Sequence, residues 1–283
     1  MNYKKPLINI LLTTFLIAGI STASIAKASE NTSSTDDSNH PSTESGELYL
    51  PTENAMADLE EALNSARESD RLLLVIMGAN WCHDSRALAA RVYKEPLSTT
   101  INRYYEILFV DVGYLERGKD VITSLGSPVY YATPTVLIVD PVSGQLINAL
   151  NRHQWANADS ISMEESIGYF QQFANTDLTA LQNGPEVDAD LQQLLEEIDS
   201  FEQAQADRLY QAYAVLAPML RAYKAGDKEA FSEETWNEVR DFRYKVPTDM
   251  DALRTEARER VAAGETDITL TYPVYPAFSF EQQ

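Results

Sequence analysis

The stretch Leu72-Leu-Leu-Val-Ile-Met-Gly-Ala-Asn-Trp81-Cys82-His83-Asp84-Ser85 decides how this sequence folds. It begins with an unbroken apolar run, which is typical of a buried strand, and continues into an apparent helix start. Cys82 lies at that junction and is the only cysteine among the 283 residues. Because the N-terminus of a helix favours the thiolate, which is the nucleophilic form of cysteine, this position predicts a reactive thiol.

A second motif, Ala132-Thr133-Pro134-Thr135-Val-Leu-Ile-Val139, follows later in the chain. Together with residues 81–85 it resembles the thioredoxin superfamily, as a Trp-Cys-x-x-Ser variant of the Trp-Cys-x-x-Cys active site followed by the family's cis-proline segment. Segments 89–96 and 107–112 are similar to those of thioredoxin-like domains in periplasmic disulfide-relay proteins. The resemblance implies a thioredoxin-like α/β fold, with a central mixed sheet flanked by helices.

The resemblance also implies roles for individual residues. In the family, the first cysteine attacks a substrate disulfide and the second cysteine resolves the mixed disulfide; here Cys82 and Ser85 occupy these two catalytic positions. A neutral hydroxyl is a far weaker nucleophile toward sulfur than a thiolate, so Ser85 cannot perform the second step. Four further residues are expected to bind the substrate: Trp81, His83, Thr133 and Pro134.

Two further departures from the family pattern accompany the missing cysteine. Ile76 replaces a buried aspartate that often assists proton transfer, and Gly78 stands where an aromatic residue is common. The absent carboxylate fits the absent resolving step. We therefore expect monothiol thiol–disulfide exchange, by mixed-disulfide capture or isomerisation of protein clients. The alternative is a redox-inactive interaction protein, in which Cys82 is a half-buried residue without chemistry.

The sequence gives less support to two other roles for Cys82, as a metal ligand and as the nucleophile of a hydrolase. A copper or zinc site with His83 and His153 lacks a second thiol, and adjacent residues at a helix start point in different directions. A cysteine hydrolase needs partners that converge in space, whereas Cys82, His83 and Asp84 are consecutive. The sequence predicts neither a metal site nor a cofactor.

The first 28 residues predict a secretory signal peptide, with basic residues before an apolar stretch and an Ala26-Lys27-Ala28 cleavage signal. The apolar stretch is short for a membrane span, so we expect export to a bacterial periplasm without stable membrane insertion. Residues 29–46 have no hydrophobic side chain and predict a disordered linker. The formal net charge of −21 argues against nucleic-acid binding, because such a surface repels phosphate backbones.

The remaining sequence predicts a thioredoxin-like domain over residues 47–182, a helical annex over residues 187–264 and an extended aromatic tail over residues 265–283. Within the domain we expect strands at residues 72–77, 107–112 and 135–139, a further strand at residues 145–150, and helices at residues 54–70, 86–93, 97–104, 119–125 and 162–173. We expect three or four helices in the annex, with Pro218 kinking or ending one and Pro247 ending another.

Overall fold

The computed structural model describes residues 47–150, 153–178 and 188–282, all of which belong to one compact unit. The predicted leader and linker at residues 1–46 lie outside the described residues. Within the described part of the chain, no helix combines the length and the apolar character that crossing a membrane requires.

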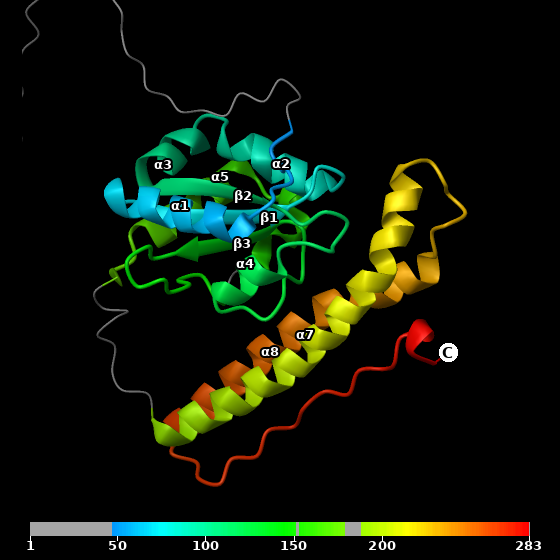
Figure 1. The fold of residues 1–283 in the computed structure, drawn as a ribbon. Helices are drawn as coiled ribbons and strands as arrows, with labels where there is room; N and C mark the ends of the chain where they lie inside the picture. Colours follow the sequence, from blue (N-terminus) through cyan, green and yellow to red (C-terminus); the bar gives the residue numbers. More distant parts are fainter. Residues whose placement is uncertain (1–46, 151–152, 179–187, 283) are drawn as a thin grey trace, which may run out of the picture. The chain divides into compact units, whose positions relative to one another are not determined.

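A three-stranded mixed sheet forms the centre of the N-terminal domain (Figure 1). Strand β1 (Leu72–Gly78) lies in the middle, parallel to β2 (Tyr105–Asp111) and antiparallel to β3 (Thr135–Val139). Every residue of β1 is buried, as expected for a central strand that is covered on both faces. The predicted mixed sheet is confirmed.

Helices cover both faces of this sheet. They are α1 (Ala55–Glu68), α2 (His83–Val92), α3 (Leu97–Tyr104), α4 (Lys119–Ser124) and α5 (Met163–Ala174). Successive side chains of a strand point to opposite faces, so Leu74 and Ile76 pack with α2, α3 and α5. Leu73 and Val75 pack with α1 and α4 on the other face. Ser162 starts α5 with a capping box, in which Ser162 and Glu165 each bond to the backbone of the other.

The predicted strand at residues 145–150 is wrong. Only Leu146 forms an isolated bridge, to the end of β3. Beyond it, the side chain of Asn148 takes the place of a neighbouring strand: its Oδ1 accepts from Ile138 N at 2.8 Å and its Nδ2 donates to Val136 O at 2.8 Å. A side-chain amide thus satisfies the backbone groups that a further strand would have paired.

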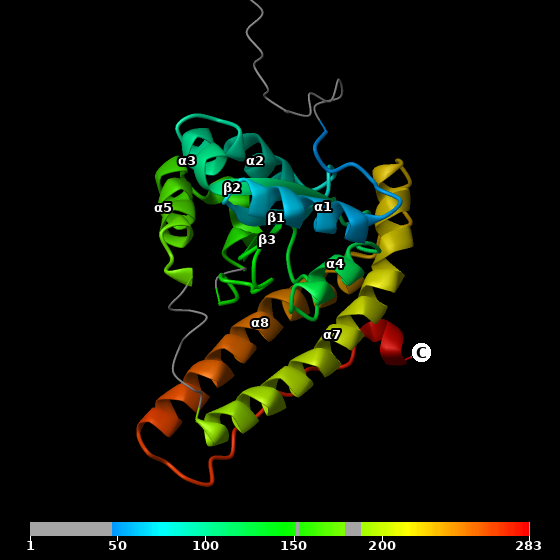
Figure 2. The same cartoon turned by 60° about the vertical axis from the view of Figure 1, so that its left-hand side comes forward.

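Within residues 188–282, two long helices replace the three or four predicted ones. Helix α7 (Ala189–Lys224) and helix α8 (Glu233–Ala262) lie side by side and antiparallel in Figures 1 and 2. Pro218 and Pro247 lie inside these helices. The helix end expected at Pro247 is therefore wrong, whereas at Pro218, where a kink or an end was expected, the helix continues. A proline removes one helical hydrogen bond, but packing over many turns outweighs that local cost. Helix α7 bends in its C-terminal third (yellow in Figure 1) instead of ending.

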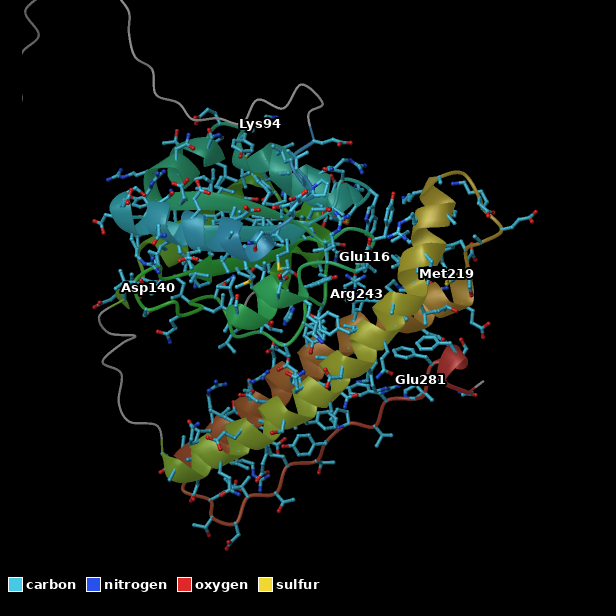
Figure 3. All side chains as sticks on the ribbon, in the orientation of Figure 1. Lys94, Glu116, Asp140, Met219, Arg243 and Glu281 are labelled. Atoms are coloured by element: carbon cyan, nitrogen blue, oxygen red, sulfur yellow. The ribbon has the colours of Figure 1, made fainter. Side chains whose placement is uncertain are left out.

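The annex, defined here as α7 and α8, shares one hydrophobic core with the sheet. A continuous cluster of buried side chains joins β1, α1 and α4 to both annex helices. Tyr213 of α7 stacks on Tyr130 with ring centroids 5.3 Å apart, and its hydroxyl donates to the Tyr130 carbonyl at 2.7 Å. At the rim, Arg221 pairs with Glu116 at 2.6 Å; Glu116 is labelled in Figure 3. Separation of the annex from the sheet would expose large aromatic rings to water.

The tail that follows α8 packs along the annex. It has little regular structure before a short 3-10 helix at Ser279–Gln282. Phe278 is buried, the Tyr275 hydroxyl donates to the Asp249 carboxylate at 2.8 Å, and Arg208 pairs with Glu281 at 2.9 Å.

Candidate active site around Cys82

Cys82 is the N-cap residue of α2, at the point where the chain leaves the central strand. Its N–H donates to Ala79 O at 3.0 Å, which closes the turn after β1, and its carbonyl accepts from Arg86 N at 3.2 Å. The side chain makes no capping hydrogen bond to α2. The half-buried sulfur therefore contacts groups outside its own helix, and its predicted position at the strand-to-helix junction is confirmed.

The groups that contact the sulfur belong to Thr133, just before β3. The Cys82 thiol donates to the Thr133 carbonyl oxygen at 3.1 Å, and the Thr133 hydroxyl lies 3.5 Å from Sγ. The Thr133–Pro134 peptide bond is cis, as the resemblance implied. A carbonyl can accept from a thiol and a hydroxyl can donate to a thiolate, so Thr133 offers a partner to both forms of Cys82.

Trp81 forms one side of the site. Its Nε1 donates to Gly113 O at 2.6 Å, and its ring stacks on Tyr114 with centroids 6.4 Å apart and 8° between the planes. Lys224, near the end of α7, lies 5.9 Å from the centre of the same ring. These contacts fix the orientation of the indole beside Cys82.

Ser85 lies in the core and not at the surface of the site. Its side chain is fully buried, and its Oγ has no hydrogen-bond partner among the described residues. The Tyr49 hydroxyl donates to the Ser85 carbonyl at 3.1 Å. A Cβ added at Gly78 would lie 2.7 Å from both Ser85 Oγ and the Tyr49 ring, which explains why glycine replaces the aromatic residue expected there. Burial raises the pKa of Tyr49, with a smaller contribution from negative charge on Cys82.

The two histidines considered for this region do not converge on the sulfur. His83 is largely exposed, with Nε2 3.0 Å from the Asp159 carboxylate and Nδ1 3.4 Å from Asp84. His153 packs edge-on against Tyr131. Among residues 47–150, 153–178 and 188–282, no group of three or more His, Cys, Asp or Glu side chains could hold a metal ion.

A cavity of about 140 Å³ opens beside the sulfur. Trp81, Cys82 and Thr133 form its domain side. Its opposite wall belongs to the annex and consists of four residues of α8: Trp236, Arg240, Arg243 and Tyr244. Arg243, labelled in Figure 3, also donates from Nε to Tyr131 O at 2.8 Å. Helix α8 therefore covers the face on which the reactive atom lies.

Sequence reasoning did not find this second wall. Trp236, Arg240 and Tyr244 recur four residues apart, which places them on one face of a helix, and that spacing is the only signal that the sequence offers. Nothing local indicates that this face lies against Cys82. Three larger cavities among the described residues, of about 400 Å³ each, lie away from Cys82.

Comparison with known proteins gives a family match and a similar solved structure. Residues 54–141 match the model of a family described as thioredoxin-like. A solved structure of a disulphide isomerase from Xylella fastidiosa Temecula1 is similar with a TM-score of 0.41 and 25% sequence identity, over 46% of this chain and 100% of that chain. No curated protein matches the chain. Residues 54–141 are therefore similar to a thioredoxin-like family, and this match supports a thiol–disulfide exchange role in general terms.

Proposed function

We propose that this protein performs thiol–disulfide exchange through Cys82 acting as a single thiol. The observation that carries the proposal is the place of the sulfur, at the N-cap of α2 and 3.1 Å from the carbonyl oxygen of Thr133, beside a cavity. The helix N-terminus favours the thiolate, and Thr133 offers a hydroxyl that can donate to it. Both features would support a nucleophilic role for Cys82, and neither would be required if Cys82 only filled space in the core.

The exchange proceeds in two balanced steps. The Cys82 thiolate attacks one sulfur of a partner disulfide, so that a new disulfide forms to Cys82 and the other partner sulfur leaves as a thiolate. A second thiolate from outside the chain then attacks the mixed disulfide and releases Cys82 again as a thiolate. Ser85 cannot replace that second thiolate, because its hydroxyl is neutral and buried in the core.

The mixed disulfide therefore persists until another thiol arrives. Such chemistry is suited to capture and isomerisation, in which disulfide bonds are exchanged without net oxidation or reduction of the partners. The predicted signal peptide at residues 1–28 supports a periplasmic location, where disulfides are formed and retained. The exchange step requires a disulfide in the partner but does not fix the partner's size.

The single cysteine makes the proposal direct to test. The chain is mixed with 2-hydroxyethyl disulfide or with a disulfide-linked peptide, and the mass of the mixed disulfide is followed with time. The same chain in concentrated urea gives the rate of an unstructured thiol. We expect the folded chain to react faster than the unfolded chain with at least one of the two reagents.

Two variants serve as controls. Cys82→Ala must form no adduct, and Cys82→Ala combined with Glu60→Cys moves the thiol to an exposed position of α1. The displaced thiol is expected to react like an unstructured one. If Cys82 in the folded chain reacts with neither reagent faster than this displaced thiol, the exchange function is refuted and an interaction role without redox chemistry is favoured.

A further inference from the structure

We infer that the partner of Cys82 is a small organic disulfide and not a polypeptide, because α8 closes the face on which a polypeptide would bind. This inference rests on the proposed exchange function and names its substrate class. It differs from the protein clients that the sequence predicts.

The size of the cavity limits what can reach the sulfur. At about 140 Å³, this cavity has about a third of the volume of each of three other cavities of the described chain, which measure about 400 Å³ each. One half of 2-hydroxyethyl disulfide has one sulfur, two carbons and one oxygen. A cysteine within a peptide is bulkier, because it carries backbone on both sides of its side chain.

The backbone that an extended client would pair with is already covered. Tyr131, Ala132 and Thr133 are 2%, 7% and 8% exposed, and the Tyr131 carbonyl accepts from Arg243 of α8 at 2.8 Å. A strand added to this segment would lie about 4.8 Å from it, within the space that the Arg243 side chain occupies. Strand addition beside Cys82 is therefore blocked by the annex.

The annex is built as a fixed wall and not as a lid. Its helices share a continuous core with the sheet, and the stacked rings of Tyr130 and Tyr213 are almost completely buried. Interfaces of this kind resemble the interior of a single domain, whereas interfaces that open in function are smaller and more polar. Movement of α8 to admit a polypeptide would expose this core.

Two side chains of α8 are placed to select the partner. Trp236 and Tyr244 lie two helical turns apart on the face toward the cavity, and both line it. Tyr244 is 46% exposed, so its ring lies at the entrance and is not required for the core. We assign to these two aromatic side chains the exclusion of bulky disulfides.

The test compares two disulfides on the full chain. The two reagents are 2-hydroxyethyl disulfide and a disulfide-linked peptide. For each reagent, the rate at which Cys82 forms the mixed disulfide is divided by the rate at which free cysteine reacts with the same reagent. We expect the ratio for the small reagent to exceed the ratio for the peptide by about tenfold or more, which corresponds to about 1.4 kcal/mol of activation free energy.

Substitutions in the wall complete the test. We expect Trp236→Ala and Tyr244→Ala each to raise the rate with the peptide severalfold, with little change in the rate with the small reagent. Tyr244→Ala is the variant that leaves the core intact. The matched control Tyr272→Ala removes an aromatic ring that packs on Phe201 of α7, away from the cavity, and should change neither rate.

Each other outcome has a defined meaning. Equal normalised rates for the two disulfides would overturn the substrate class while leaving the exchange function intact. A size preference that neither wall variant relaxes would overturn the role of α8. If neither disulfide reacts faster than an unstructured thiol, the exchange function itself fails.

Discussion

The hydroxyl of Tyr213 gives the sharpest test of whether annex and domain form one structural unit. Tyr213 is 1% exposed, and its hydroxyl donates to the carbonyl of Tyr130, which is also fully buried. Burial raises the pKa of Tyr213 to about 12, so the hydroxyl keeps its proton and remains a donor at all ordinary pH values. Tyr213→Phe removes this single donor and retains the stacked ring.

The loss of stability in Tyr213→Phe can be estimated from the Tyr130 carbonyl, which would lose its hydrogen-bond donor. A buried carbonyl that loses its hydrogen bond costs about 1–3 kcal/mol. With a loss of about 2 kcal/mol and a urea dependence of about 2 kcal/mol per molar, the unfolding midpoint should fall by roughly 1 M. Circular dichroism reports mainly on the long annex helices. Tryptophan fluorescence reports on Trp81 and Trp155 in the domain and on Trp236 in the annex.

For the native sequence, both signals should change in a single coincident transition, and Tyr213→Phe should move both midpoints together. Tyr223→Phe, on the same helix at a half-buried position, is the matched control and should change the free energy of unfolding by less than about 0.5 kcal/mol. Separate transitions for domain and annex, or an unchanged midpoint in Tyr213→Phe, would refute the shared core and with it the fixed wall over Cys82.

Three further outcomes are expected. Gly78→Ala should lower the free energy of unfolding by about 1–3 kcal/mol in urea titration, because the added methyl group would lie 2.7 Å from the Tyr49 ring. Trp81→Phe should cost about 0.5–1.5 kcal/mol in the same assay, since it loses a 2.6 Å hydrogen bond to a backbone carbonyl. A hydrogen bond from Arg208 lowers the pKa of Glu281, so this carboxylate stabilises the fold above the ordinary glutamate pKa of about 4.3, and the stabilisation is lost as pH falls through the lower folded value. Glu281→Gln should therefore be less stable than the native chain at pH 7, with the difference shrinking as pH falls through the lowered folded pKa.

The parts of the site that the sequence predicted are those with local signals. The apolar run of β1 and the helix start after it place Cys82 at the N-cap of α2, whatever the rest of the chain does. The Thr133-Pro134 motif before β3 could be matched to a known family pattern. The sheet order then brings β1 and β3 side by side, and Thr133 meets the sulfur.

The parts that the sequence missed depend on contacts between distant segments. Arg243 and Tyr131 are 112 residues apart in the chain, and no local pattern of either segment indicates their hydrogen bond. From backbone chemistry alone, Pro218 was expected to kink or end a helix and Pro247 to end one. Both helices continue, because the long apolar contact between α7 and α8 outweighs one lost hydrogen bond at each proline. At residues 145–150, the side-chain amide of Asn148 bonds to the backbone of β3 where a further strand was predicted. An alternation of apolar residues along the sequence cannot reveal such a side-chain contact.

The most direct test of the central claim is the rate at which Cys82 forms a mixed disulfide with 2-hydroxyethyl disulfide, measured by intact mass in the folded chain and in the same chain in urea. A reactive single thiol at the end of an accessible cavity should react faster when folded, and the adduct should persist until an external thiol is added. A folded chain that reacts more slowly than the unfolded one would mean that the fold protects Cys82 from exchange, and would contradict the account.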